Sequence, residues 1–452
     1  MKKRFAICST IVLLLLLSAC GALQTLDFSY APEGEELSSL MVETSQTHRA
    51  ELEHVPSAAD FADAISDDPA SAGLLSESEV ESLLRGHAAM ETVSKEQAQS
   101  DVSLLFRTLQ SAYGAYEYFG QEKFDAAEDA VTQWLSSQDD EIKVSVLGEK
   151  LQESLAFMLA HDAHAVIYEP AAEEIEAQVR YKYFFADGFY FSKDVNGSYY
   201  MVNDGERWTL SSFSDEHVSV QPTLLKDGRI VYQPTLFALR KDAVQSSVTL
   251  KNSSGKAKIY RLDWTESQPL DVDLGTLDYR LIQEDGLTYV SLRSFVSGTY
   301  DNMLARYARE GAKARGSKAV IYDLRGNVGG SDSWPRKWIQ SFLGTQNSIE
   351  TSMLYAQKNS ALFAAENSES LLPEDEGTCF AREVHGTWYE NDIPIIVLVD
   401  DHCGSSGEGA VQLLKTLDNV LIVGSNTAGY QLCGNISTFT LPYTGIGVRF
   451  GS

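Results

Sequence analysis

A serine stands where a short apolar run gives way to a helical pattern. Residues 393–399 read as a buried strand, and residues 408–417 carry helical spacing, so Ser405 lies at a strand-to-helix corner. At such a corner the serine Oγ projects, and the free amides of the first helical turn can stabilise negative charge. This position suits a nucleophile that attacks a carbonyl. The spacing to Glu408 also satisfies a helix capping box, so a purely structural serine is the alternative.

A glycine-rich turn follows a second apolar run. Residues 318–324 read as a strand, and the turn from Asp323 to Gly330 (Asp-Leu-Arg-Gly-Asn-Val-Gly-Gly) precedes a helical segment. Glycines let the backbone approach a reacting carbonyl and direct an N–H at its oxygen. A tight strand-to-helix connection without chemistry would have the same composition. The spacing matches neither a P-loop nor a dinucleotide fingerprint.

Three histidines could supply a general base. His161 and His164 follow a helical segment, and His402 precedes Ser405 by three residues. Imidazole, with an ordinary pKa of about 6.5, can take a proton from serine and return it to a leaving amine. A metal site at His161 and His164 has no further Cys or His ligand signature, so we predict no metal and no cofactor.

The segments around these residues predict an α/β core. Short apolar runs typical of buried parallel strands alternate with helical patterns at 303–313, 334–343 and 408–417; the runs are 318–324, 393–399 and 420–423. Active sites of such sheets lie beyond the carboxyl ends of the strands, where both the serine and the glycine-rich turn fall.

The rest of the chain divides by texture. Residues 20–95 are acidic and poor in aromatics, which predicts a tether with one short helix near 77–84. Residues 96–178 carry three apolar helical stripes and predict a small helical domain. Residues 179–276 alternate short Tyr-, Phe- and Val-rich runs with Asp-Gly and Asn-Gly turns, which predicts an antiparallel β module of PDZ-like size. A hairpin is expected from 246–251 and 257–264. Residues 277–452 hold the α/β core.

The N-terminus reads as an export signal with a lipid anchor. Lys2, Lys3 and Arg4 precede an apolar run at 11–17, and Leu-Ser-Ala-Cys at 17–20 is a lipobox, the motif of bacterial lipoproteins. We therefore expect a signal peptide at 1–19, lipidation of Cys20, and an extracytoplasmic protein anchored to a bacterial membrane. An ordinary secreted protein with Cys at this position is the alternative.

Charge and cysteine content narrow the partners further. The formal net charge of −28 argues against nucleic acid as a direct partner. Beyond Cys20, the exported chain holds Cys379, Cys403 and Cys433. An extracytoplasmic setting permits one bridge, and Cys403–Cys433 is predicted because both lie just beyond strand ends that flank Ser405. Three unpaired thiols are the alternative.

Three blocks in this order resemble the tail-specific, or C-terminal-processing, serine proteases. They are Asp-Leu-Arg-Gly-Asn-Val-Gly-Gly at 323–330, Ser-Ser-Gly-Glu at 405–408 and Gly-Ser-Asn-Thr-Ala-Gly at 424–429. The looser similarity runs from about 101 to 452. The resemblance implies a crotonase-like (ClpP-type) core preceded by a PDZ-like module. It places the nucleophile on Ser405 and the oxyanion donors on the amide of Ser406 and a glycine amide at 329–330, with Gly329 preferred over Gly330.

The resemblance also bears on the base. Members with a Ser–Lys dyad have Lys after this third block, whereas Tyr430 and Gln431 follow Gly429 here. The branch that includes the tricorn core and the nisin-resistance protease uses a His in an Asp-x-His pattern, which falls on Asp162 and His164. His164 is therefore the expected base, His161 a helix-face or capping residue, and His402 the second-ranked base. No third or fourth catalytic residue is assigned.

Two functions follow from the resemblance. The first is a membrane-anchored peptidase that hydrolyses exported polypeptides through a Ser–His pair and an acyl-enzyme, with the substrate held as an added β-strand. The second is a non-catalytic lipoprotein that binds peptides or apolar ligands on the same fold, as the retinoid-binding proteins of vertebrate eyes do on a related fold. The retained Ser405, His164 and glycine pair favour the peptidase.

Overall fold

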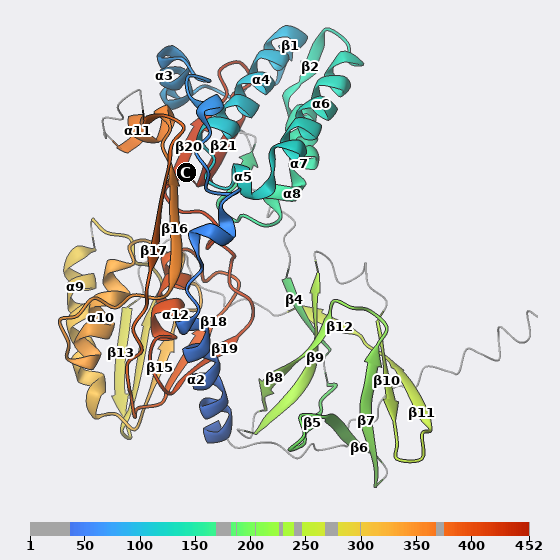
Figure 1. Cartoon of the computed structure of the whole chain (residues 1–452), viewed down its shortest axis with the longest axis vertical. Coiled ribbons are helices and arrows are strands. Elements are labelled where there is room, and N and C mark those ends of the chain that lie inside the picture. The colour runs from blue at the N-terminus through green and yellow to red at the C-terminus, as the bar shows by residue number, and fades with distance from the viewer. Residues whose placement is uncertain are drawn as a thin grey trace, which may run out of the picture. The chain divides into compact units, whose positions relative to one another are not determined.

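The structure is a computed structural model that describes residues 37–168, 182–186, 188–203, 205–225, 229–238, 246–266, 279–298, 300–367 and 375–451. Two compact units are present (Figure 1). One contains the β strands of residues 181–268, and the other comprises residues 42–180 and 269–452. The predicted signal peptide, Cys20 and the first part of the predicted tether lie outside the described residues.

The α/β core is built on a five-stranded sheet, as the sequence predicts. Its order is β13-β14-β15-β18-β19, formed by Tyr279–Glu284, Leu287–Leu292, Ala319–Asp323, Ile395–Val399 and Val420–Gly424. The last four strands are parallel, and β13 is antiparallel to β14. Asp285 and Gly286 both have positive φ in the hairpin that joins β13 to β14. Along β15 and β18 buried residues alternate with half-buried ones, so one face of the sheet is packed more deeply than the other.

Three helices complete this core, close to their predicted ranges. They are α9 (Asp301–Glu310), α10 (Ser333–Leu343) and α12 (Ser406–Leu414). Trp338 of α10 is fully buried and meets the ring of Tyr322 on β15 edge-on, with centroids 4.8 Å apart. It also stacks with Tyr307 of α9 at 6.5 Å. These aromatic contacts fix both helices against the sheet that carries the glycine-rich turn.

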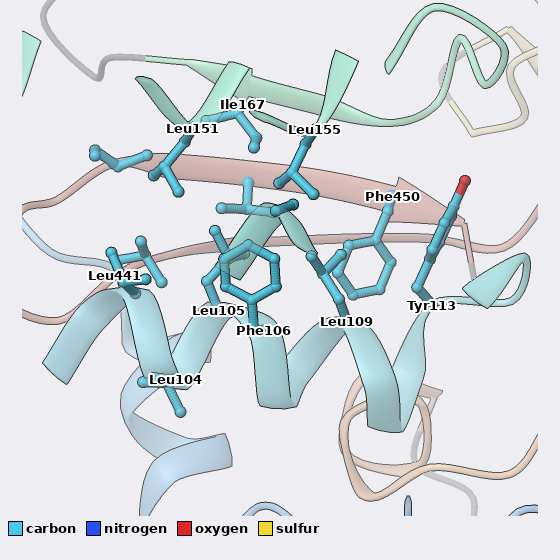
Figure 2. Close-up of a cluster of buried hydrophobic side chains, with 14 of the residues drawn as sticks. Leu104, Leu105, Phe106, Leu109, Tyr113, Leu151, Leu155, Ile167, Leu441 and Phe450 are labelled. Atoms are coloured by element: carbon cyan, nitrogen blue, oxygen red, sulfur yellow. The ribbon is translucent and has the colours of Figure 1, made fainter. Parts of the chain in front are cut away.

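The helical region belongs to the same unit as the α/β core. Its main helices are α4 (Lys95–Ala112), α6 (Gln121–Ser136) and α7 (Val144–Ser154), with single turns at α5 (Tyr116–Phe119) and α8 (Ala156–Leu159). They pack on a three-stranded antiparallel sheet of order β20-β21-β3, formed by Ile436–Thr440, Gly447–Gly451 and Val166–Tyr168. Figure 2 shows Leu105 and Leu109 of α4, with Tyr113 at its C-terminal cap, facing Phe450 of β21 and Leu155, the cap of α7. The end of the chain therefore completes the core of the helical region.

The prediction of a tether at 20–95 is wrong for residues 37–94. This segment forms α2 (Leu37–Glu53), two 3-10 turns η1 (Ala58–Phe61) and η2 (Pro69–Ser71), α3 (Glu77–Arg85) and β1 (Thr92–Ser94), which pairs with β2 (Glu141–Lys143). Ser45 Oγ of α2 accepts the backbone N–H of Asn419 at 2.9 Å, and Glu51 pairs with Lys415. The few apolar residues of the segment are buried by partners far along the chain, which its acidic composition does not reveal. The short helix expected near 77–84 is α3.

The β module consists of two antiparallel sheets. Their orders are β11-β10-β7-β6-β5 and β12-β4-β9-β8. In chain order from β4 to β12 the strands are Lys182–Ala186, Ser192–Lys193, Tyr199–Asn203, Glu206–Phe213, Val218–Leu224, Ile230–Ala238, Ser247–Lys251, Ala257–Arg261 and Trp264–Glu266. The expected hairpin is β10–β11. The module's described residues form no helix, so its PDZ-like character stays a prediction.

One further hairpin was not predicted. β16 (Met353–Lys358) and β17 (Cys379–Val384) form an antiparallel ladder, and α11 (Ala361–Asn367) follows β16. Near its end, the Lys358 ammonium is buried and pairs with Glu117 of α5, which attaches the hairpin to the helical region. Across the ranges that the structure describes, no helix has both the length and the apolarity to cross a membrane.

Candidate active site

Ser405 sits in a strained turn at the start of α12. Its φ of 52° and ψ of −121° are rare for a residue with a side chain, and a strained backbone of this kind persists only where the surroundings enforce it. The turn follows β18 at the carboxyl end of the sheet, as the sequence predicts. The carboxylate of Glu408 accepts the backbone N–H of Ser405 at 3.0 Å, which is one half of a capping box. The helix cap thus holds the serine in its strained conformation.

Glu408 binds more than the helix start. It is buried, and its two oxygens accept four hydrogen bonds. Besides the Ser405 amide, the donors are the Thr427 hydroxyl at 2.6 Å and the amides of Gly429 and Tyr430, each at 2.8 Å. One carboxylate therefore joins the second and third sequence blocks. The sequence pattern predicted Glu408 only as a capping residue. Its role in holding residues 427–430 depends on contacts that the pattern does not reveal.

The two glycines of the first block lie against the serine turn for steric reasons. Gly329 has φ of 99°, and a Cβ there would lie 2.7 Å from Ser405 Cβ. Gly330 has φ of 138°, and a Cβ there would lie 2.0 Å from the backbone carbon of Phe295. Only glycine fits at either position. The Gly330 carbonyl also accepts the Ser406 hydroxyl at 2.8 Å, so the glycine turn and the start of α12 are hydrogen-bonded to each other.

The backbone N–H groups near Ser405 differ in whether they already donate a hydrogen bond within the protein. The amides of Ser406 and Gly330 have no hydrogen-bond partner among the described residues. The amide of Gly329, by contrast, donates to the side-chain oxygen of Asn327 at 2.9 Å. The preference for Gly329 as an oxyanion donor is therefore wrong for this arrangement, because its N–H is already used. Ser406 and Gly330 are the pair left to stabilise a developing oxyanion.

His164 is buried between β3 and the end of the chain. Its Nδ1 lies 2.5 Å from the backbone carbonyl oxygen of Cys433. A carbonyl only accepts hydrogen bonds, so this contact is a hydrogen bond when the neutral ring carries its proton on Nδ1, which leaves the basic lone pair on Nε2. The backbone N–H of His164 donates to Asp162 Oδ1 at 2.9 Å. The backbone and the ring of His164 are thus each held by a hydrogen bond.

The loop at 428–431 connects the histidine to the serine. The Tyr430 ring meets the His164 ring edge-on, with centroids 4.5 Å apart. On its other side the same tyrosine lies against Gly404, where a Cβ would come within 2.6 Å of Tyr430 Cδ2. The Gln431 side chain donates to the Ser405 carbonyl at 3.2 Å. The structure therefore gathers His164 and Ser405 around one loop, although they lie far apart in the sequence.

The other two histidines are placed differently. His161 Nδ1 donates to the Phe157 carbonyl at 2.9 Å, a helix-end contact of the kind expected. His402 lies 3.5 Å from Asp401, and its amide donates to Asp400 at 3.2 Å. The part of the chain that the structure describes contains no group of three or more His, Cys, Asp or Glu side chains arranged to hold a metal ion.

A buried ion pair fixes the start of the glycine-rich turn. Burial of Asp323 opposes ionisation, but hydrogen bonds from Arg325 and Tyr289 and the charge of Arg293 outweigh it and lower the pKa of this carboxyl to about 2. Beside it, Asp400 accepts the Gly326 amide at 2.8 Å. Hydrogen bonds and ion pairs of Asp323 and Asp400 thus join the carboxyl ends of β14, β15 and β18 to the glycine-rich turn.

The predicted Cys403–Cys433 disulfide is absent: both residues are free thiols, as is Cys379. Cys403 belongs to the hydrophobic core of the five-stranded sheet, whereas Cys433 belongs to that of the helical region. Burial raises the pKa of both thiols. Both cysteines lie near strand ends in the sequence, but residue type and position alone do not show that their side chains face different hydrophobic cores.

Comparison with known proteins agrees with the blocks found in the sequence. Residues 286–449, which include the glycine-rich turn and the Ser405 block, match the model of Peptidase family S41. No curated protein matches the chain. Among solved structures, mature CPAF is 13% identical over 79% of this chain and 88% of its own, with a TM-score of 0.41.

Two further solved structures are similar over comparable lengths. The photosystem II D1 C-terminal processing protease is 14% identical over 78% of this chain and 87% of its own, with a TM-score of 0.34. A lipoprotein from Streptococcus agalactiae is 14% identical over 81% and 86%, with a TM-score of 0.31. The match of residues 286–449 to the model of peptidase family S41, which spans the α/β core with its glycine-rich turn and Ser405 block, identifies the chain as a serine-type peptidase.

Proposed function

We propose that this peptidase cleaves exported polypeptides with Ser405 as nucleophile and His164 as general base, through an acyl-enzyme. The observation that carries the proposal is the strained Ser405 turn, which lies against Gly329 and contacts the same 428–431 loop as His164. Strain of this kind at a strand-to-helix corner is typical of an exposed nucleophile.

The proposed chemistry uses groups of this chain alone. Ser405 Oγ attacks the peptide carbonyl while its proton passes to His164 Nε2. Negative charge develops on the carbonyl oxygen, where the amides of Ser406 and Gly330 can donate to it. His164 then returns the proton to the departing amine, which leaves an ester on Ser405. Water hydrolyses this ester with His164 again as base, and the free carboxyl product and Ser405 result.

The proposal includes an anchor and a docking module. The lipobox at 17–20 supports lipidation of Cys20, which would hold the enzyme at a bacterial membrane with access to exported chains. The two sheets of the β module offer strand edges to which an extended polypeptide could add. If Cys20→Ser neither blocks maturation nor releases the protein from membranes, the anchor is excluded.

A labelling experiment tests the catalytic proposal. A fluorophosphonate probe should label the wild type and not Ser405→Ala, because only an activated serine attacks the probe. His164→Ala should label far more slowly, whereas His161→Ala serves as a matched control and should label normally. Equal labelling of wild type and Ser405→Ala would refute Ser405 as nucleophile. A wild type that neither reacts with the probe nor cleaves peptides would favour the ligand-binding alternative.

A further inference from the structure

The histidine proposed as base has an unusual orienting partner. In serine hydrolases a carboxylate commonly accepts the Nδ1 proton of the base and fixes its tautomer. Here the group within hydrogen-bond distance of His164 Nδ1 is the backbone carbonyl of Cys433. The neighbouring carboxylate, Asp162, contacts the histidine at its backbone N–H instead.

Asp162 is fully buried at the centre of a small polar cluster. Its Oδ1 accepts the His164 amide at 2.9 Å, and its Oδ2 accepts the Tyr113 hydroxyl at 3.0 Å. Burial, the negative charge of Asp162 and a hydrogen bond to it together raise the pKa of the Cys433 thiol, so this thiol stays protonated and donates to Asp162. Cys433 therefore touches the histidine system twice, with its carbonyl on the ring and its thiol on Asp162.

Rigid neighbours hold this cluster in place. Tyr113 ends α4 and packs on Phe450 with ring centroids 5.6 Å apart, a contact that Figure 2 shows. A Cβ on Gly451 would lie 2.4 Å from Cys433 Cβ, so the last strand backs the cysteine closely. Arg449 Nε donates to the His164 carbonyl at 3.1 Å. The carbonyl that faces the ring is thus part of a packed core and not of a loose loop.

We infer that the Cys433 carbonyl sets the Nδ1–H tautomer of His164 and that Asp162 is a positioning residue, which fixes the turn carrying the base. This inference rests on the proposed function, since it assumes that His164 is the base. It gives a backbone carbonyl the role of orienting the base, for which the sequence analysis assigned no residue. A side-chain substitution at Cys433 keeps that carbonyl, whereas a substitution at Asp162 frees the histidine turn and leaves the Tyr113 hydroxyl without its acceptor.

Nitrogen NMR of the full chain tests the tautomer directly. With 15N-labelled histidine, long-range proton–nitrogen correlations distinguish the two neutral tautomers, and the His164→Gln variant identifies the His164 signals among the eight histidines. We expect the Nδ1–H form at neutral pH. An Nε2–H form would overturn the inference. Because this readout needs no turnover, it can fail while fluorophosphonate labelling of Ser405 succeeds, and the reverse.

Paired variants test the positioning role. Asp162→Asn should lower kcat at least about tenfold with little change in KM. Cys433→Ala should keep the Nδ1–H tautomer of His164, because the substitution keeps the backbone carbonyl. The exposed Asp139→Asn is the control. A normal kcat in Asp162→Asn would overturn the role of Asp162. Loss of the Nδ1–H tautomer in Cys433→Ala would make the thiol, not the carbonyl, the group that sets it. Should Asp162→Asn not fold, Tyr113→Phe removes one hydrogen bond from the same cluster and must lower kcat without moving KM; an unchanged kcat would refute the inference.

Discussion

The carboxylate of Glu408 accepts the backbone N–H of Ser405 from one turn further along α12, and the same carboxylate holds the loop that contacts His164. The helix cap and the candidate nucleophile are therefore one feature. The sequence left a choice between a capping serine and a catalytic serine. In the structure the two interpretations are compatible, because the cap also keeps Ser405 in its strained conformation.

Glu408→Gln is expected to damage both stability and turnover. Each carboxylate oxygen accepts two hydrogen bonds, so an amide NH₂ at either place would face two donors. We expect the free energy of unfolding to fall by about 1–3 kcal/mol and kcat to fall at least about tenfold. Denaturant unfolding and peptide cleavage measure the two effects, with the exposed Glu122→Gln as control. A variant as active as the control would show that the carboxylate is not needed to hold the turn.

Alanine substitution of each histidine should show, by the loss in kcat, which one acts as the general base. Nucleophile and base act as one unit, so His164→Ala should cost nearly as much as Ser405→Ala, on the order of 10³-fold in kcat. His161→Ala and His402→Ala should cost far less. Steady-state cleavage of one peptide by all four variants is the measurement. The assignment fails if His402→Ala abolishes turnover while His164→Ala keeps it.

Gly329→Ala should inactivate the enzyme through sterics alone. The new Cβ would lie 2.7 Å from Ser405 Cβ and 2.9 Å from the Gly404 carbonyl, on a backbone with φ of 99°. The serine turn must move, so labelling of Ser405 should drop at least about tenfold even where the protein folds. Gly316→Ala is the matched control, because a Cβ there meets no atom within 4 Å. Normal labelling of Gly329→Ala would mean that the turn tolerates displacement.

Acid should loosen α2 before it unfolds the core. Burial, helped by the nearby Lys415 and opposed by Glu51, lowers the pKa of His48 to about 4. The unfolded chain takes up this proton near pH 6.5, so the stabilisation from neutral His48 is full above about 6.5 and is lost as pH falls toward 4. His48→Leu should show a flatter dependence of Tm on pH across this window. Parallel curves for the two proteins would contradict the role of His48.

Cys379, Cys403 and Cys433 should all react as free thiols, at rates that follow their exposure to the reagent. Thiol counting on denatured, unreduced chain should find three free groups apart from Cys20. In the native protein Cys379, which is half-buried, should react first, because Cys403 and Cys433 are buried and burial raises their pKa. A count of one would restore the Cys403–Cys433 bridge.

The sequence predicted the parts whose signals are local. Three strands, β15, β18 and β19, and three helices, α9, α10 and α12, lie within a few residues of their predicted ranges. The three helical stripes predicted within residues 96–178 correspond to α4, α6 and α7. Buried strands and amphipathic helices can be predicted because each carries its own periodicity. The turn of Ser405 was predictable for the same reason, as it lies between two such elements. The PDZ-like nature of the β module and the lipid anchor stay predictions.

What the sequence could not supply depends on long-range contacts. Leu52, Leu75 and Leu83 are buried by residues from other parts of the chain, so an acidic segment that reads as a tether is folded. The contact of His164 with a backbone carbonyl leaves no trace in residue type. Asp162 was visible as part of an Asp-x-His pattern, but its burial against Tyr113 was not.

The pairing of β21 with β3 has a consequence for biosynthesis. β3 comes shortly after His164, and its partner β21 is the last strand that the structure describes, so the surroundings of His164 cannot form until residues 447–451 have been synthesised. A nascent chain already carries His164 and Ser405 long before it carries Arg449 and Phe450. Under the proposed mechanism, proteolytic activity would thus appear only after the residues of β21 have been synthesised and paired with β3.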